Sequence, residues 1–124
     1  MPPLTESDLE QAAIDWLTEL GYTWAYGPAL AVDGEHPERP DYQEPLLPAR
    51  LQAAIARINP HLPAAAQAGA FNRVARLGQP SLLLNNHAFH SLLVNGVEVQ
   101  YKNPDGRTVS GRAYLLDYDN PDNN

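Results

Sequence analysis

The sequence contains no cysteine and a single lysine among its 124 residues. The absence of cysteine excludes disulfide bonds and thiolate metal sites, and it favours a reducing compartment. No stretch approaches the ~20 apolar residues that a membrane-spanning helix needs, and the first residues lack the basic start of a signal peptide. A chain of 124 residues, 44% of them hydrophobic, suits one small domain. The sequence therefore predicts a soluble, cytoplasmic, single-domain protein.

The net charge of −7 is distributed unevenly along the chain. Residues 1–44 hold ten carboxylates and one arginine, residues 45–113 hold two carboxylates and seven basic side chains, and residues 114–124 hold three aspartates. The total charge repels nucleic acid, but the basic middle part is compatible with a patch that faces phosphate groups. Ordinary solvated helix faces are the alternative explanation.

An amphipathic helix is predicted near the N-terminus. Ser7 can serve as its N-cap with Glu10 three residues later, which is the spacing of a capping box, and Thr5 with Asp8 is an alternative cap. Apolar residues then recur at helical spacing as far as Gly21, which ends the pattern. This apolar stripe comprises Leu9, Ala12, Ala13, Trp16, Leu17 and Leu20.

The rest of the chain predicts an α+β fold. Residues 22–26 alternate aromatic and small side chains as a short strand does, and glycines and prolines make residues 27–45 a loop. Three short helices are then predicted, from Pro48 to Ile58, from Pro63 to about Gly78, and from Pro80 to Asn95. Their expected inward residues are Leu47, Leu51, Ala54, Ile55, Ile58, Ala68, Phe71, Val74, Leu83, Leu84, Ala88, Leu92 and Leu93. Residues 97–101 and 108–118 around a turn at 103–106 predict a closing hairpin. The fold class is thus an amphipathic first helix, a short strand, a cluster of three helices and a C-terminal β-hairpin.

Six separated segments together resemble the start of the R subunit of type I restriction enzymes. They are residues 5–22, 33–39, 53–60, 85–93, 96–99 and 117–124, and they occur in the order expected for that family. The resemblance implies a cytoplasmic subunit that cleaves foreign DNA and translocates it at the expense of ATP. It also implies Mg²⁺ and ATP as cofactors, and methylation and specificity subunits as partners.

In that family the N-terminal region is a nuclease of the PD-(D/E)xK kind, which needs carboxylates that hold a divalent cation and a lysine that orients the nucleophile. The family's Asp and its E-x-K pair would follow Asn124, and Lys102 precedes a turn outside any E-x-K setting. A Walker A loop is absent as well. Residues 1–124 are therefore expected to form the N-terminal part of the nuclease domain, truncated before the catalytic strands. We expect this piece alone to be inactive and to bind neither Mg²⁺ nor ATP.

Glu10 is the candidate catalytic residue that the resemblance places within the chain. Nucleases of this class often carry a glutamate on the first helix that faces the metal, and such a role would be expressed only in the full-length protein. The alternative is that Glu10 belongs to the capping box with Ser7.

The sequence contains no complete metal site. His87 and His90 share a helix face but have no third ligand in register. The aspartates after residue 116 lack the glycine and glutamate of a calcium loop, so we interpret them as turn residues.

Four arginines are candidate DNA-binding residues. Arg50 and Arg57 lie seven residues apart, and Arg73 and Arg76 lie three apart, so each pair shares a helix face. If both faces point the same way, they form a track for DNA phosphates. The alternative is that they form ion pairs with the acidic first helix, at Asp15 or Glu19.

A second functional class is a stand-alone acidic module that binds restriction-modification subunits or a partner that mimics DNA. The basic stretch of residues 45–113 argues against mimicry of DNA by this chain. The resemblance along nearly the whole length favours the restriction subunit.

Overall fold

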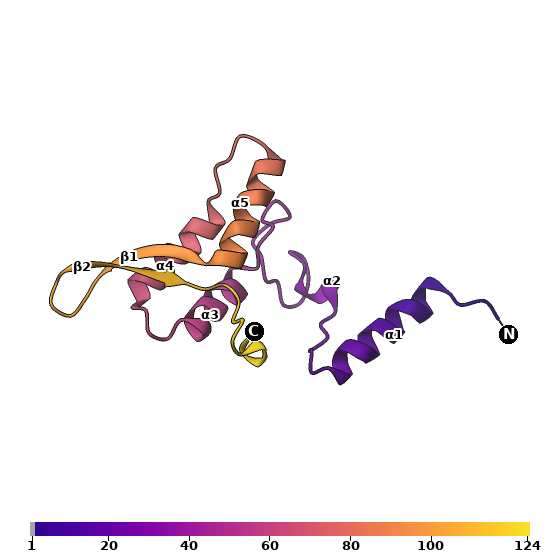
Figure 1. The fold of residues 1–124 in the computed structure, drawn as a ribbon. Helices are drawn as coiled ribbons and strands as arrows, with labels where there is room; N and C mark the ends of the chain where they lie inside the picture. Colours follow the sequence, from indigo (N-terminus) through magenta and orange to yellow (C-terminus); the bar gives the residue numbers. More distant parts are fainter. Residues whose placement is uncertain (1) are drawn as a thin grey trace. The chain divides into compact units, whose positions relative to one another are not determined.

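A computed structural model describes residues 2–124 of the chain (Figure 1). The chain divides into two compact units, one ending at Gln43 and one spanning Glu44–Asn124. The first unit contains α1 (Glu6–Glu19) and the short α2 (Gly27–Leu30). The second contains α3 (Pro48–Ile58), α4 (Ala64–Ala75), α5 (Leu82–Asn95), β1 (Val97–Lys102), β2 (Thr108–Ala113) and a 3₁₀ turn, η1 (Pro121–Asn123). Helices together with one antiparallel hairpin confirm the α+β class.

The cap of α1 is the Thr5 box. The Thr5 hydroxyl accepts a hydrogen bond from the Asp8 backbone N–H (3.2 Å), and the Asp8 carboxylate accepts one from the Thr5 backbone N–H (2.9 Å). The Asp8 carboxylate also accepts a hydrogen bond from the Thr5 hydroxyl (2.7 Å), and this bond, followed by the one from the Thr5 backbone N–H, lowers the pKa of Asp8. Ser7 lies inside the helix, so the box of Ser7 with Glu10 is wrong. The earlier cap also places two acids, Glu6 and Asp8, in the first turn, where the helix dipole favours negative charge.

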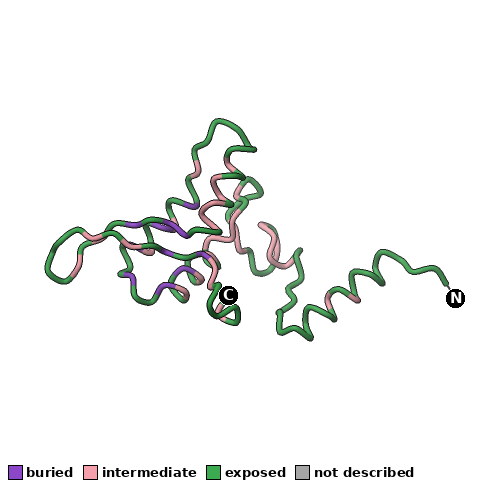
Figure 2. Tube along the Cα trace, in the orientation of Figure 1, coloured by how far each residue is buried: buried purple, intermediate pink, exposed green. Residues whose placement is uncertain are grey.

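The apolar stripe of α1 is exposed within the first unit. The helix forms as predicted and stops at Gly21, whose φ of +94° suits a glycine. None of its residues is buried, and Figure 2 colours it almost entirely as exposed. Trp16 has 68% of its surface exposed and Leu20 75%. In the first unit, α1 therefore forms a helix although its apolar side chains stay exposed.

Residues 22–26 do not form a strand, so that prediction is wrong. A strand requires neighbouring backbone groups with which to pair, and the only sheet in the described part of the chain joins β1 to β2. The segment has no regular secondary structure, and the rings of Trp24 and Tyr26 lie with their centroids 6.1 Å apart.

The loop after α2 is ordered by short-range hydrogen bonds. The Tyr42 hydroxyl donates to the Asp33 carboxylate at 2.7 Å, and this bond lowers the pKa of Asp33 and raises that of Tyr42. Arg39 lies over the Tyr42 ring, 5.6 Å from its centroid. At Gly34 a Cβ atom would collide with the Pro28 and Ala29 carbonyl groups, so only glycine fits.

The hydrophobic core belongs to the second unit, where α3 packs on α4 and α4 packs on both strands (Figures 1 and 2). Its buried residues are Ile55, Leu62, Ala66, Ala70, Val74, Val97, Val99, Ala113 and Leu115. On α4 the buried positions recur every four residues from Ala66 to Val74. Ala68 is exposed, contrary to prediction, because an alanine-rich helix offers several apolar stripes of similar quality.

Helix α5 ends at Asn95 as predicted and begins at Leu82, two residues after the predicted Pro80, but its first turn is exposed. The Ser81 hydroxyl accepts a hydrogen bond from the Leu84 N–H at 3.2 Å, and Gly96 ends the helix with a φ of +78°. Leu83 is 78% exposed, and Leu84 is exposed as well, so both were wrongly expected to point inward. The core contacts of this helix come from Phe89, Leu92 and Leu93, in its second half.

The hairpin follows its turn signal. Asn103 accepts hydrogen bonds from the backbone N–H groups of Asp105 and Arg107, and Gly106 has a φ of +77°. The register pairs Val97 with Ala113 and Lys102 with Thr108. The second strand therefore ends at Ala113, earlier than the Tyr118 expected.

Asn59 binds Tyr114, the residue that follows β2. The Asn59 side chain is fully buried at the end of α3, and its amide nitrogen donates to the carbonyl groups of Ile55 and Tyr114, both at 2.8 Å. Its amide oxygen accepts from the Tyr114 N–H at 2.7 Å. The backbone N–H and C=O of Tyr114, which in a strand would bond to a neighbouring strand, thus bond to the Asn59 side chain at the end of α3.

We predict that Asn59→Ala destabilises the protein by roughly 2–3 kcal/mol, because it leaves the Tyr114 N–H and C=O groups inside the fold without partners. Urea denaturation followed by far-UV circular dichroism measures the loss. Asn72→Ala is the matched control, since Asn72 is exposed on α4, and it should change stability by less than ~0.5 kcal/mol. Equal effects of the two substitutions would contradict the role of Asn59.

Candidate functional site

Glu10 lies on α1 in the first unit, with its side chain exposed. Because Thr5 and Asp8 complete the capping box, Glu10 is not part of it, and the capping interpretation of this residue is wrong. Its role at a metal in the whole protein stays a prediction.

The described residues do not supply a cage for Mg²⁺. That ion takes oxygen ligands in near-octahedral geometry, usually from carboxylates. Across residues 2–124 no three or more His, Asp or Glu side chains are grouped so that they could hold a metal ion. His87 and His90 are both exposed on α5.

The last eight residues form a turn centred on Asp117. One oxygen of its carboxylate accepts from the backbone N–H groups of Asp119 (3.1 Å) and Asn120 (2.9 Å), and the other accepts from the Asn123 amide (3.0 Å). The hydrogen bond from Asn120, followed by that from Asn123, lowers the pKa of Asp117. Asn124 bonds back to the N–H and C=O of Asp117. Asp117 therefore serves turn chemistry, as the sequence predicted.

The four candidate arginines have different surroundings. Arg57 on α3 donates from Nε to the Asn123 carbonyl at 2.8 Å, and so it ties η1 to α3. Arg50 is exposed near the start of the same helix. Arg73 and Arg76 both line a hollow of about 320 Å³ that also involves Gly78, Gln79, Ala88 and Ser91. The structure thus brings together Arg73 and Arg76, whereas Arg57 has a structural partner elsewhere.

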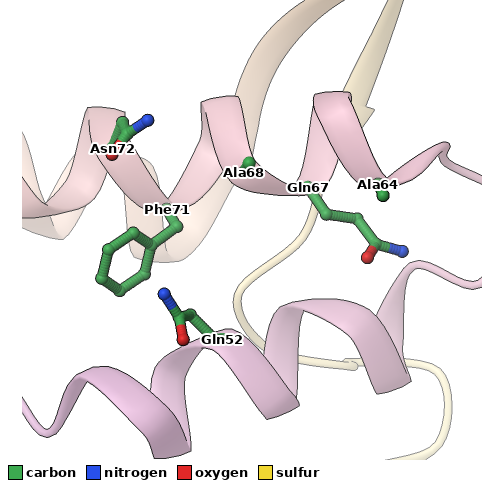
Figure 3. Close-up of a pocket in the computed structure, with 6 residues that line it drawn as sticks. All are labelled: Gln52, Ala64, Gln67, Ala68, Phe71 and Asn72. Atoms are coloured by element: carbon green, nitrogen blue, oxygen red, sulfur yellow. The ribbon is translucent and has the colours of Figure 1, made fainter.

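A second hollow, of about 290 Å³, lies between α3 and α4 (Figure 3). Gln52 projects from α3 toward Phe71 on α4, while the Gln67 amide donates to the backbone carbonyl groups of Asn59 and Leu62. None of the residues that line it is charged. This hollow can offer amide hydrogen bonds and one aromatic surface, but no general acid or base.

Sequence reasoning missed Asn59. The predicted helix ends at Ile58, directly before Asn59 and Pro60, and α3 does end there. A signal was available in the same segment, because an asparagine at the end of an apolar stripe is placed to enter the core. Its partner Tyr114 lies 55 residues away, and no local pattern identifies such a pairing.

None of the helices in the described part of the chain has the length and apolar character needed to cross a membrane. The fold and side chains define a small α+β protein of two units, with acidic and basic segments and without a metal cage among residues 2–124.

The sequence matches the family described as "Type I restriction enzyme R protein N terminus" over residues 3–124. It is 30% identical over 116 residues to the "Putative type I restriction enzyme MjaIXP endonuclease subunit" of Methanocaldococcus jannaschii. It is 29% identical over 121 residues to the "Type I restriction enzyme HindI endonuclease subunit" of Haemophilus influenzae. The alignments cover 94% and 98% of this chain and 11% of each relative. No solved structure matches the chain significantly.

The chain therefore belongs to the family of N-terminal regions of type I restriction enzyme R proteins. It spans about 11% of the length of the curated relatives that it matches. The resemblance found in the six sequence segments is confirmed.

We predict that acid opens the turn around Asp117. Its pKa is lowered in the folded state, so its contribution to stability is complete above the unfolded value of ~3.9 and is lost as the pH falls through the lower folded value. A carboxyl-carbon NMR titration should give a lower pKa in the native chain than in concentrated urea. The Asn120 amide signal should shift in the same acidic range. Identical titrations in the two states would refute the assignment.

Proposed function

We propose that residues 1–124 form the N-terminal part of the nuclease domain of a type I restriction endonuclease subunit. The whole protein cleaves foreign DNA after ATP-driven translocation, in the cytoplasm, together with methylation and specificity subunits. The observation that carries this proposal is the family match over residues 3–124, together with two relatives whose names say "endonuclease subunit".

In this proposal the chemistry of the PD-(D/E)xK kind is completed by parts of the protein beyond residues 1–124. Two features support it. The described residues hold no carboxylate cluster suited to a metal ion, and the single lysine, Lys102, is exposed at the end of β1 beside the hairpin turn. A nuclease of this kind needs both a cation and an ammonium group at the phosphodiester, and these side chains do not bring the two together.

The first test compares the chain with the whole complex on plasmid DNA. We expect the purified 124-residue chain to give neither cleavage nor ATP hydrolysis in Mg²⁺ and ATP, because its sequence contains neither an E-x-K pair nor a Walker A loop. The complete endonuclease subunit, assembled with its methylation and specificity subunits, should cleave. Mg²⁺-dependent nicking by the chain alone would overturn the proposal that catalytic groups lie beyond residues 1–124. An inactive complete complex would overturn the proposed function.

Glu10 is proposed to contribute a carboxylate to the metal site of the whole protein. It is exposed on α1, and the capping box is complete without it. Carboxylate oxygens are the ligands that Mg²⁺ prefers, held directly or through water.

In the complete complex we predict that Glu10→Ala lowers the cleavage rate by roughly 10- to 100-fold, the range seen when support of a metal is lost, with stability changed by less than ~0.5 kcal/mol. Initial rates and thermal unfolding give the two readouts. Glu19→Ala is the control, because Glu19 lies nine residues along α1 and hence on the opposite face. Equal losses for both variants would assign the effect to α1 as a whole.

A second candidate function is an acidic interaction module that binds restriction-modification subunits. The exposed aromatic residues of the first unit favour it, since Trp16, Trp24 and Tyr26 are each more than half exposed. The same unit carries most of the carboxylates. Calorimetric titration of the chain into the assembled methylation and specificity subunits decides this: heat of binding supports the module, and its absence rejects it.

A further inference from the structure

The second unit contains a long segment without any acidic residue. Between Glu44 and Glu98 there is no aspartate or glutamate, whereas four arginines occur there. All of α3, α4, α5 and their connections fall within this segment. A positive potential on these helices is therefore not balanced by acids of the same elements.

Arg73 and Arg76 concentrate this charge at one hollow. Arg73 is in the last turn of α4 and Arg76 is its C-cap, so the two side chains are neighbours on the helix surface. Both are exposed, and among the described residues neither guanidinium has a hydrogen-bond or ion-pair partner. Like charges at this spacing repel each other. The hollow thus holds two cations without an anion.

The other groups that line the hollow fit an anion. Its polar lining comes from Gln79 and Ser91, and no carboxylate is present. Ser91 is half-buried on α5, and the backbone N–H of Gln79 is already bonded to the Asn85 side chain at 2.9 Å. Two guanidinium groups with a nearby hydroxyl are the donors that suit phosphate oxygens, because each guanidinium can bind two oxygens at once.

The location of Arg73 and Arg76 at the C-terminal end of α4 also has a simpler explanation. Positive side chains near a helix C-terminus are stabilised by the helix dipole. That effect explains a cation in the last turn, but it requires neither a hollow facing α5 nor the absence of acids from both helices. It also predicts an effect on stability alone, and this separates the two explanations.

We propose that Arg73 and Arg76, with Ser91, form a phosphate-binding site between α4 and α5, and that its occupant is a backbone phosphate of duplex DNA. The DNA source rests on the proposed function, whereas the phosphate chemistry does not. Arg57 is not part of this site, because its guanidinium holds the Asn123 carbonyl.

The experiment measures fluorescence anisotropy of a labelled duplex with the 124-residue chain across a range of salt concentrations. Arg73→Ala/Arg76→Ala should weaken binding roughly tenfold at low salt and reduce the slope of log affinity against log salt by up to ~2. Lys102→Ala/Arg107→Ala is the matched control: it removes the same charge from exposed positions of the hairpin, and it should keep the slope within about one of the wild-type value. Arg73→Lys/Arg76→Lys keeps the charge and should recover most of the slope.

A second arm replaces DNA with ATP or inorganic phosphate, followed by calorimetry. Binding of DNA that depends on Arg73 and Arg76 supports the proposal as stated. Binding of nucleotide or phosphate alone, lost in the same double variant, supports the phosphate site but overturns the DNA source. Equal losses in the arginine and hairpin variants, or no binding in either arm, overturn the site. Thermal melts exclude unfolding as the cause, and the plasmid assay of the complete complex tests the proposed function independently.

Discussion

The second unit depends on the paired amide of one buried asparagine. Asn59 has none of its surface exposed, and its side chain joins the end of α3 to Tyr114 just after β2. Its backbone carbonyl accepts from Gln67, which connects α4 to the same point. An unpaired amide at this depth would be strongly unfavourable, so the two helices and the hairpin must align together for the fold to form. The apolar contacts of the core stabilise the unit without fixing how its elements are aligned, and the hydrogen bonds of Asn59 fix that alignment.

Local signals in the sequence account for most element boundaries. Pro48 and Asn59 delimit α3, Ser81 and Gly96 delimit α5, and the hairpin turn follows from the Asn-Pro-Asp-Gly sequence at 103–106. Each of these signals acts within a few residues, through a cap, a fixed φ angle or a positive φ angle. They are readable in one sequence because nothing distant is needed.

The predictions that failed depend on distant partners or on redundancy. Residues 22–26 lack a neighbouring strand, and Tyr114, the residue after β2, pairs with Asn59 from 55 positions away. Ala68 and Leu83 were wrongly expected to point inward, because runs of alanine or leucine satisfy more than one stripe.

The candidate site shows the same division. Spacing predicted that Arg73 and Arg76 are neighbours, but the capture of Arg57 by Asn123 depends on how the chain end folds back onto α3. Two overlapping capping boxes left Glu10 ambiguous, and only the hydrogen bonds of Thr5 decide between them.

The sheet of the second unit has two strands, so β1 and β2 each carry an outer side that no strand of residues 2–124 occupies. An added strand would take its alignment from whichever side it joined, since hydrogen bonding copies the pleat of the existing pair. The Asn59 amide, which positions Tyr114, would then determine the register of every residue of the added strand. If the hydrogen bonds of Asn59 moved by one residue along the chain, each side chain of the added strand would point to the opposite face of the sheet.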